Sequence, residues 1–128
     1  MYKPNLAIDL DGVIHSYHKG FHNGEIYGHP VPGVREFLEK MREKGFRVVI
    51  FTARVHAETS RQREILSDEV ASWLDLHRIP FDVITDKKVP ACAYIDDRAI
   101  SFRQDEATTW DDVESRVDFL ADSYKRIG

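Results

Sequence analysis

Residues 6–12 read Leu6-Ala7-Ile8-Asp9-Leu10-Asp11-Gly12, and this short stretch decides how the chain folds. Its apolar first half is typical of a buried strand, and two carboxylates lie where that strand should end. Side chains alternate along a strand, so Asp9 and Asp11 leave it on the same side. Gly12 permits a tight turn directly after them. The stretch therefore predicts a strand that leads into a reactive site.

Strands and helices alternate along the rest of the chain. Further strands are predicted at 46–52, 81–85, 91–95 and, at the sheet edge, 100–102. Helices are predicted between Pro32-Gly33 and Gly45, over much of 57–77, and after an N-cap at Thr109. This alternation predicts an α/β fold in which a mainly parallel, Rossmann-like sheet lies between two helical layers, as a three-layer α/β/α sandwich.

The 128 residues are expected to form one domain, 1–128, with a flap or loop insertion at about 13–32. No apolar run approaches the length of a membrane helix, so no membrane partner is expected. A single cysteine, Cys92, favours a reducing, cytoplasmic location and is expected to be a buried strand residue. The net charge of −4 does not favour nucleic acid as a partner.

Ligand sites in parallel sheets lie beyond the carboxyl ends of the strands. Three predicted strands end there in polar residues: Asp9 and Asp11, Thr52, and Asp96 and Asp97. Two carboxylates about 4 Å apart repel by roughly 4 kcal/mol at an effective dielectric constant near 20, so such a cluster needs a cation. Mg²⁺ fits best, because it accepts carboxylates and keeps positions open for phosphate. Asp9 could attack phosphorus while Asp11 transfers protons.

Four segments in this order resemble the haloacid dehalogenase-like (HAD) superfamily of phosphatases. They are Asp9-Leu10-Asp11-Gly12, Phe51-Thr52-Ala53-Arg54, Lys88, and Tyr94-Ile95-Asp96-Asp97-Arg98, and they span nearly the whole chain. The resemblance implies that Asp9 is the nucleophile and Asp11 the general acid and base. It also implies that Thr52 binds the phosphoryl group and that Lys88 pairs with it and orients Asp9. Lys87 is the alternative lysine, because Val89 separates Lys88 from Pro90.

The same resemblance implies the ligands of the cation and the contacts of the substrate. Mg²⁺ would be held by the Asp9 side chain, the Asp11 backbone carbonyl and Asp96, with Asp97 further out or bound through water. The substrate would contact Gly12, Thr52, Ala53, Arg54 and Lys88. For Arg54 and Arg98 the simpler interpretation is a surface salt bridge. The histidines of the flap are interpreted as polar flap residues or substrate contacts rather than zinc ligands.

The chain leaves no room for a large cap domain, so it resembles a capless member of the family. The flap would then be the main local source of specificity. A homo-oligomer, in which a neighbouring subunit lends a lid, is one alternative that the sequence leaves open.

Three functions are compatible with these residues. The first is a phosphomonoesterase that acts on a small phosphorylated metabolite, such as a sugar phosphate or a nucleotide. The second is a 3′-phosphatase of nucleic-acid ends, since the Ile-Asp-Asp-Arg ending and the arginines after Thr52 are similar to the phosphatase half of phage polynucleotide kinases. The net acidity of the chain weakens this alternative. The third is a non-catalytic phosphate- or protein-binding module, against which the presence of both Asp9 and Asp11 argues.

Overall fold

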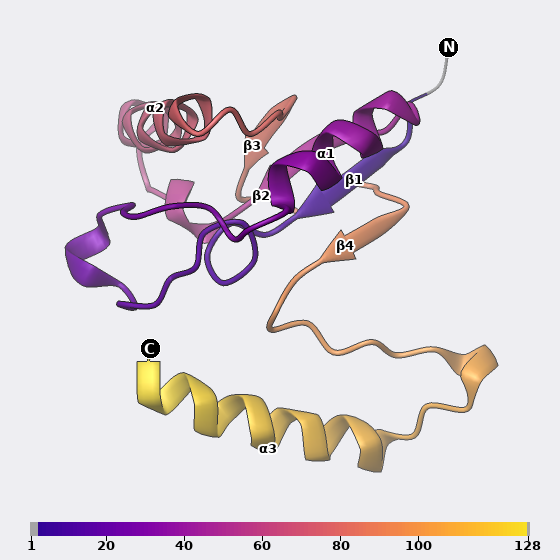
Figure 1. The fold of residues 1–128 in the computed structure, drawn as a ribbon. Coiled ribbons are helices and arrows are strands. Elements are labelled where there is room, and N and C mark those ends of the chain that lie inside the picture. Colours follow the sequence, from indigo (N-terminus) through magenta and orange to yellow (C-terminus); the bar gives the residue numbers. More distant parts are fainter. Residues whose placement is uncertain (1–2, 128) are drawn as a thin grey trace.

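The computed structural model describes residues 3–127, and the side chains of residues 3–124. Its strands are β1 (Asn5–Ile8), β2 (Arg47–Phe51), β3 (Val83–Thr85) and β4 (Ala93–Ile95). Its α-helices are α1 (Val34–Glu43), α2 (Ser60–Leu76) and α3 (Trp110–Ile127) (Figure 1). No helix in this part of the chain has the length and apolar character to cross a bilayer. The predicted alternation of strands and helices is confirmed.

The four strands form one parallel sheet in the order β3-β2-β1-β4. Ile8 of β1 lies in register with Ile50 of β2 and with Ile95 of β4. The central position of β1 explains its composition, because an inner strand of a parallel sheet is covered on both faces and must be apolar. The predicted α/β fold with a parallel sheet is therefore confirmed, and β1 ends at the centre of one sheet edge.

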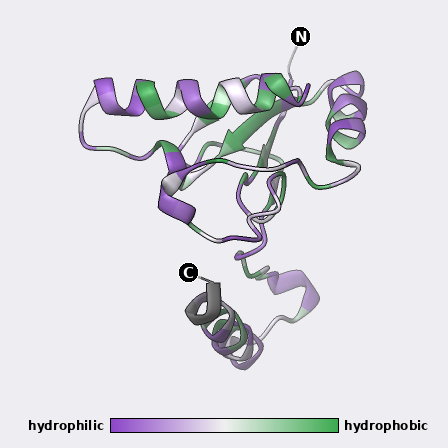
Figure 2. Cartoon of the chain, turned by 60° about the vertical axis from the view of Figure 1, so that its left-hand side comes forward, coloured by the Kyte–Doolittle hydropathy of each residue, from purple (hydrophilic) through white to green (hydrophobic). Residues whose placement is uncertain are grey.

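One face of the sheet carries the core and is covered by α1 and α2. Ile8, Val48 and Ile50 are buried there against Leu38 of α1 and Leu74 of α2. Thr59 caps the start of α2 by accepting a hydrogen bond from the backbone N–H of Gln62. In Figure 2 the visible strands are largely hydrophobic, whereas the helices carry both kinds of residue. The core thus fixes the strands whose ends form the site.

The opposite face of the sheet bears Phe51 and Tyr94, whose rings meet edge to face at 5.6 Å. The last helix, α3, lies apart from the sheet in both views (Figures 1 and 2). Its start has the predicted N-cap, since Thr109 accepts from the N–H of Asp112 at 3.1 Å. None of its side chains up to residue 124 is buried. The second helical layer of the predicted sandwich is therefore not seen within residues 3–127.

Two local predictions are wrong. Residues 100–102 form no strand, because the chain turns away from the sheet after Asp96 and the ring of Phe102 stacks on Trp110 at 4.5 Å. Cys92 is exposed rather than buried. It precedes β4 by one residue and contributes only its backbone, whose N–H donates to the Asn5 carbonyl at 2.9 Å.

The flap, residues 13–32, contains one short 3₁₀ turn, η1 (His22–Gly24), and no long helix or strand. An antiparallel bridge between His15 and Pro30 closes its base. Its outer part is tied to the body by Trp73 of α2, whose indole N–H donates to the Gly28 carbonyl at 3.3 Å. The flap therefore rests beside the carboxyl ends of β1 and β2.

Candidate functional site

Polar side chains gather where the strands end. Asp9 directly follows β1, Thr52 follows β2, and Asp96 follows β4. Because these strands are parallel and adjacent, their carboxyl ends meet at one edge of the sheet. A cavity of about 330 Å³ opens at this edge, and Asp9, Asp11, Thr52, Ala53 and Asp96 all line it. The structure thus brings five of the residues named from the sequence to one cavity.

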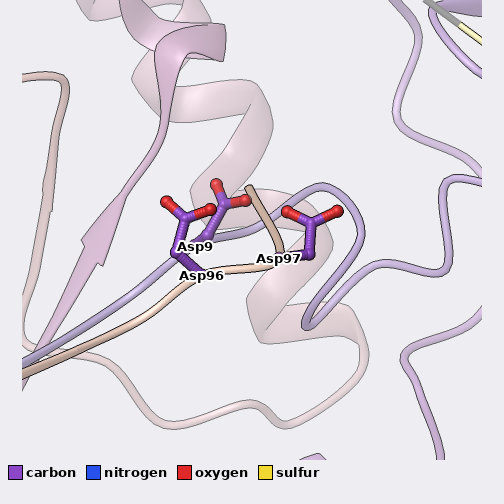
Figure 3. Close-up of side chains that lie close together, drawn as sticks. All are labelled: Asp9, Asp96 and Asp97. Carbon is purple, nitrogen blue, oxygen red and sulfur yellow. The ribbon is translucent and has the colours of Figure 1, made fainter. Parts of the chain in front are cut away.

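Three carboxylates converge at the end of β1. Asp9, Asp96 and Asp97 each offer an oxygen, and these three oxygens lie within 4.8 Å of one another. Figure 3 shows the three side chains rising on the same side of the chain, with Asp9 and Asp96 next to each other. Oxygen ligands at this spacing suit a hard divalent cation. The donor set therefore fits Mg²⁺ by its chemistry, although other hard cations share that preference.

The pKa of Asp9 reflects both its burial and the crowding of these carboxylates. Burial, followed by the neighbouring charges of Asp96 and Asp97, raises the pKa of Asp9 to about 8. A hydrogen bond from the Leu10 N–H to Asp9 Oδ1, at 2.9 Å, opposes the shift. The same bond orients the carboxylate. Full ionisation of the cluster near neutral pH therefore requires a counter-charge, which a bound cation would provide.

Asp11 is held by two basic side chains. Arg54 Nε donates to Asp11 Oδ2 at 2.7 Å, and His15 Nδ1 lies 2.8 Å from Asp11 Oδ1. The two other nitrogens of Arg54 donate to flap carbonyls, Nη1 to Gly24 at 2.8 Å and Nη2 to Glu25 at 3.1 Å. Arg54 is thus neither a free surface group nor a free anion-binding group. It connects Asp11 to the flap.

Thr52 and Gly12 shape the immediate surroundings of Asp9. Thr52 is buried, and its Oγ1 accepts from the N–H of Arg54 at 3.2 Å, which leaves its O–H as a donor toward the cavity. Gly12 has φ +88°, and a Cβ there would lie 2.3 Å from Asp97 Oδ2. Its own N–H donates to the His15 carbonyl at 2.8 Å. Gly12 therefore makes room for Asp97, and it is not among the residues that line the cavity.

The two candidate lysines, Lys87 and Lys88, lie outside the cavity. Lys88 is exposed, with its ammonium 5.5 Å from the centre of the Tyr94 ring, and neither it nor Lys87 lines the cavity. Arg98 does line it and supplies a positive charge at its wall. The guanidinium of Arg98 also lies 4.8 Å from the ring of Tyr124 in α3. A role for either lysine toward phosphate stays a prediction.

Sequence reasoning missed several lining residues. Tyr17, Phe51 and Asp86 line the cavity, and none was named as a site residue. Burial raises the pKa of Tyr17, with a contribution from the charge of Asp11, so its phenol remains a hydrogen-bond donor. A hydrogen bond with His56 at 2.8 Å lowers the pKa of Asp86, which remains ionised. Asp86 could have been found, since it follows β3 as Asp9 follows β1.

His15 was the least accessible to sequence reasoning. It is fully buried, and its Nε2 has no hydrogen-bond partner among the described residues. The rings of Tyr27 and Trp73 surround it, with centroids 4.5 Å and 5.4 Å away. Its only sequence signal is its position four residues after Asp11, across the turn at Gly12. The contact depends on how the flap folds back, which no local pattern encodes.

Comparison with known proteins adds information on the fold. No family model matches the chain, and no curated protein matches it. Among solved structures it is similar to a conserved protein from Bacteroides thetaiotaomicron, with 20% sequence identity over 88% of this chain and 98% of that chain, and a TM-score of 0.54. At this identity the similarity concerns the fold alone. It agrees with the parallel α/β architecture of β1 to β4.

Proposed function

We propose that the chain is a Mg²⁺-dependent phosphomonoester hydrolase that acts on a small phosphorylated metabolite through an aspartyl-phosphate on Asp9. The proposal includes a HAD-like fold of the capless type. One observation carries it: Asp9, Asp96 and Asp97 bring their oxygens within 4.8 Å at the end of β1, beside a cavity that Asp11 and Thr52 also line. A binding module has no need for a half-buried carboxylate beside a second one that can carry protons.

The charge of the cavity explains the need for a cation. Among the described side chains, four carboxyl groups line it, those of Asp9, Asp11, Asp86 and Asp96, and Arg98 is the one arginine. A phosphate dianion would be repelled by this wall. Asp9, Asp96 and Asp97 would hold Mg²⁺, which when bound supplies the positive charge that draws in and polarises the phosphoryl group.

Each step of the hydrolysis can then be assigned to a residue of the chain. A carboxylate oxygen of Asp9 attacks phosphorus, and the bond between phosphorus and the leaving oxygen breaks. The Thr52 O–H donates to a phosphoryl oxygen, and Arg98 balances its charge. Asp11 gives a proton to the leaving oxygen and then takes one from the water that attacks the aspartyl-phosphate, so that inorganic phosphate leaves and Asp9 is restored.

The test uses the purified protein with Mg²⁺ and a panel of phosphomonoesters that includes sugar phosphates, mononucleotides and 3′-phosphorylated oligonucleotides. Hydrolysis should stop with EDTA and return with Mg²⁺. Asp9→Asn should abolish turnover. Asp105→Asn, which removes an exposed carboxylate paired with Arg103, should leave it unchanged. Mass spectrometry after an acid quench should detect one added phosphoryl group on the wild type only.

Two results would contradict the proposal. If wild type and Asp9→Asn are equally inert across the panel, the non-catalytic binding module is the hypothesis that remains. A strong preference for the oligonucleotides would instead indicate end repair of nucleic acids. The structure offers less support for that alternative, because the N–H donors of Arg54 are directed to Asp11 and to flap carbonyls rather than outward.

A further inference from the structure

A second cavity, of about 400 Å³, lies beside the first. The flap forms one wall through Tyr17, Phe21 and Ile26, and α2 forms the other through Leu66 and Val70. Three residues line both cavities, Asp11, Tyr17 and Ala53, so the two adjoin at these residues. The size is within the usual range for sites that bind small organic molecules.

The position of Asp11 indicates which part of the substrate can occupy this second cavity. The group that protonates a leaving oxygen must lie within hydrogen-bond reach of it. Asp9 lines the first cavity only, whereas Asp11 lines both. A phosphoryl group next to Asp9 therefore places the ester oxygen near Asp11, at the boundary, and the rest of the leaving group has the second cavity available to it.

The residues that line the second cavity determine which kind of leaving group it can bind. Aromatic and aliphatic side chains make up most of the two walls, and the ring of Phe21 is 64% exposed although it is large and apolar. The charged or ionisable residues are Asp11, Glu69, Arg54 and His56, and the His56 ring is already hydrogen-bonded to Asp86 at 2.8 Å. Since Arg54 already donates to Asp11, Gly24 and Glu25, it is not free to bind a second anion. The cavity thus suits a flat, uncharged group and disfavours an anionic one.

From this we infer that the cavity between the flap and α2 binds the leaving group of the substrate, and that this group carries an uncharged aromatic or heterocyclic ring. The inference rests on the proposed hydrolysis. It makes the flap and α2 together the source of specificity. Phe21 and Leu66, from opposite walls, contact the ring.

The experiment compares kcat/KM within pairs of substrates that share the same ester chemistry. Uridine 5′-monophosphate and ribose 5-phosphate differ by a heterocycle, and 2-phenylethyl phosphate and ethyl phosphate differ by a benzene ring. The ring-bearing member of at least one pair should be preferred by about tenfold or more, the size of effect that apolar contacts give. Preference in both pairs indicates that the apolar face suffices, and preference in the uridine pair alone indicates that the heterocycle is recognised. Orotidine 5′-monophosphate, which adds a carboxylate to the base, should be a poorer substrate than uridine 5′-monophosphate.

Two variants test whether the preference for ring-bearing substrates arises in this cavity. Phe21→Ala removes an exposed flap side chain, and Leu66→Trp fills the cavity from α2; both should reduce the preference by about tenfold. Ile65→Trp is the matched control, because Ile65 is 47% exposed on the same helix and does not line this cavity. Its substrate preference should equal that of the wild type.

The inference and the proposed function fail in different ways. Equal kcat/KM within both pairs, or a preference that survives in both Phe21→Ala and Leu66→Trp, would overturn the leaving-group site while the hydrolase stands. Faster turnover of the orotidine ester would overturn the uncharged character of the ring. Absence of hydrolysis of every ester would overturn the proposed function and this inference with it.

Discussion

Gly12 sets how closely the end of β1 approaches the loop after β4. We expect Gly12→Ala to lower the free energy of unfolding by about 1–2 kcal/mol, because φ +88° is strained for alanine. The new Cβ would also displace the Asp97 carboxylate, because a Cβ built on Gly12 would lie only 2.3 Å from Asp97 Oδ2. Affinity for Mg²⁺ should therefore fall as well. Denaturant unfolding measures the first effect, and calorimetric titration with Mg²⁺ measures the second.

Gly45→Ala separates the two effects. Gly45 has φ +99°, and a Cβ there meets nothing within 4 Å. This variant should lose a similar amount of stability and keep the affinity for Mg²⁺ of the wild type. Equal loss of affinity in both variants would show that the contact between Gly12 and Asp97 has no part in cation binding.

The raised pKa of Asp9 makes the stability of the cation-free protein depend on pH. Its folded-state pKa is about 8, against 3.8 for an aspartate in an unfolded chain, so between these pH values the folded protein binds the extra proton. Stability is therefore greatest below pH 4 for this group and is lost as pH rises toward 8. Solvent weakens the effect at this partly exposed group, and we expect a loss of about 2 kcal/mol from pH 5 to 8.5.

Asp9→Asn isolates this contribution, since the amide does not titrate. In EDTA, the fall in unfolding free energy between pH 5 and 8.5 should be smaller in Asp9→Asn than in wild type. Mg²⁺ should stabilise the wild type more at pH 8.5 than at pH 5, because the cation favours the ionised carboxylates. Parallel pH profiles for the two proteins would refute the shift.

How far the site was predictable depends on where each residue lies. Asp9, Asp96 and Asp97 could be placed together because each follows a strand of one parallel sheet, and strand ends can be recognised locally. Side chains in loops could not be placed in this way. Lys88 precedes β4 within the irregular segment after β3, and its direction depends on packing against Tyr94.

At the scale of elements, the flap is held by few contacts, and Arg54 makes two of them. Arg54→Ala should release residues 22–26, because the carbonyls of Gly24 and Glu25 lose their donors. Hydrogen exchange of this segment should become faster, and proteolysis there should increase. The melting temperature should change little in comparison, since most side chains of the flap are at least partly exposed.

Arg63→Ala is the control for this change. Arg63 is also a partly buried arginine that donates to a backbone carbonyl, that of Ala57 at 2.7 Å, but its hydrogen bonds go to Ala57 and Ser60 rather than to the flap. Its exchange pattern in residues 22–26 should match the wild type. If Arg54→Ala also leaves these rates unchanged, Trp73 and the bridge between His15 and Pro30 hold the flap without help.

Elements were predictable where burial and period agree. β1 and β2 are short and apolar, and α2 presents Val70, Trp73 and Leu74 on one face, so local pattern and packing coincide. At residues 100–102 the local sequence pattern and the packing disagree. The apolar residues are the right type for a strand, yet the chain has already left the sheet, and a path of this kind is set by tertiary structure rather than by propensity.

At the scale of the whole molecule, the chain divides into the body formed by β1–β4 with α1 and α2, and the C-terminal segment that ends in α3 (Figure 1). Removal of residues 104–128 should leave cooperative unfolding intact and lower the melting temperature by only a few degrees, since no described side chain of α3 is buried. Circular dichroism during heating measures this. Collapse of the transition would instead place α3 on the open face of the sheet, as the third layer of the predicted sandwich.

The two tryptophans fall one on each side of this division. Trp73 is 6% exposed and touches the flap through Gly28, whereas Trp110 is 73% exposed at the start of α3. Indole emission shifts to the red in water, so the intrinsic fluorescence of the protein has a blue component and a red component. Acrylamide should quench the red component first. A single optical signal can thus report the anchorage of the flap and the exposure of the C-terminal helix separately, without any added label.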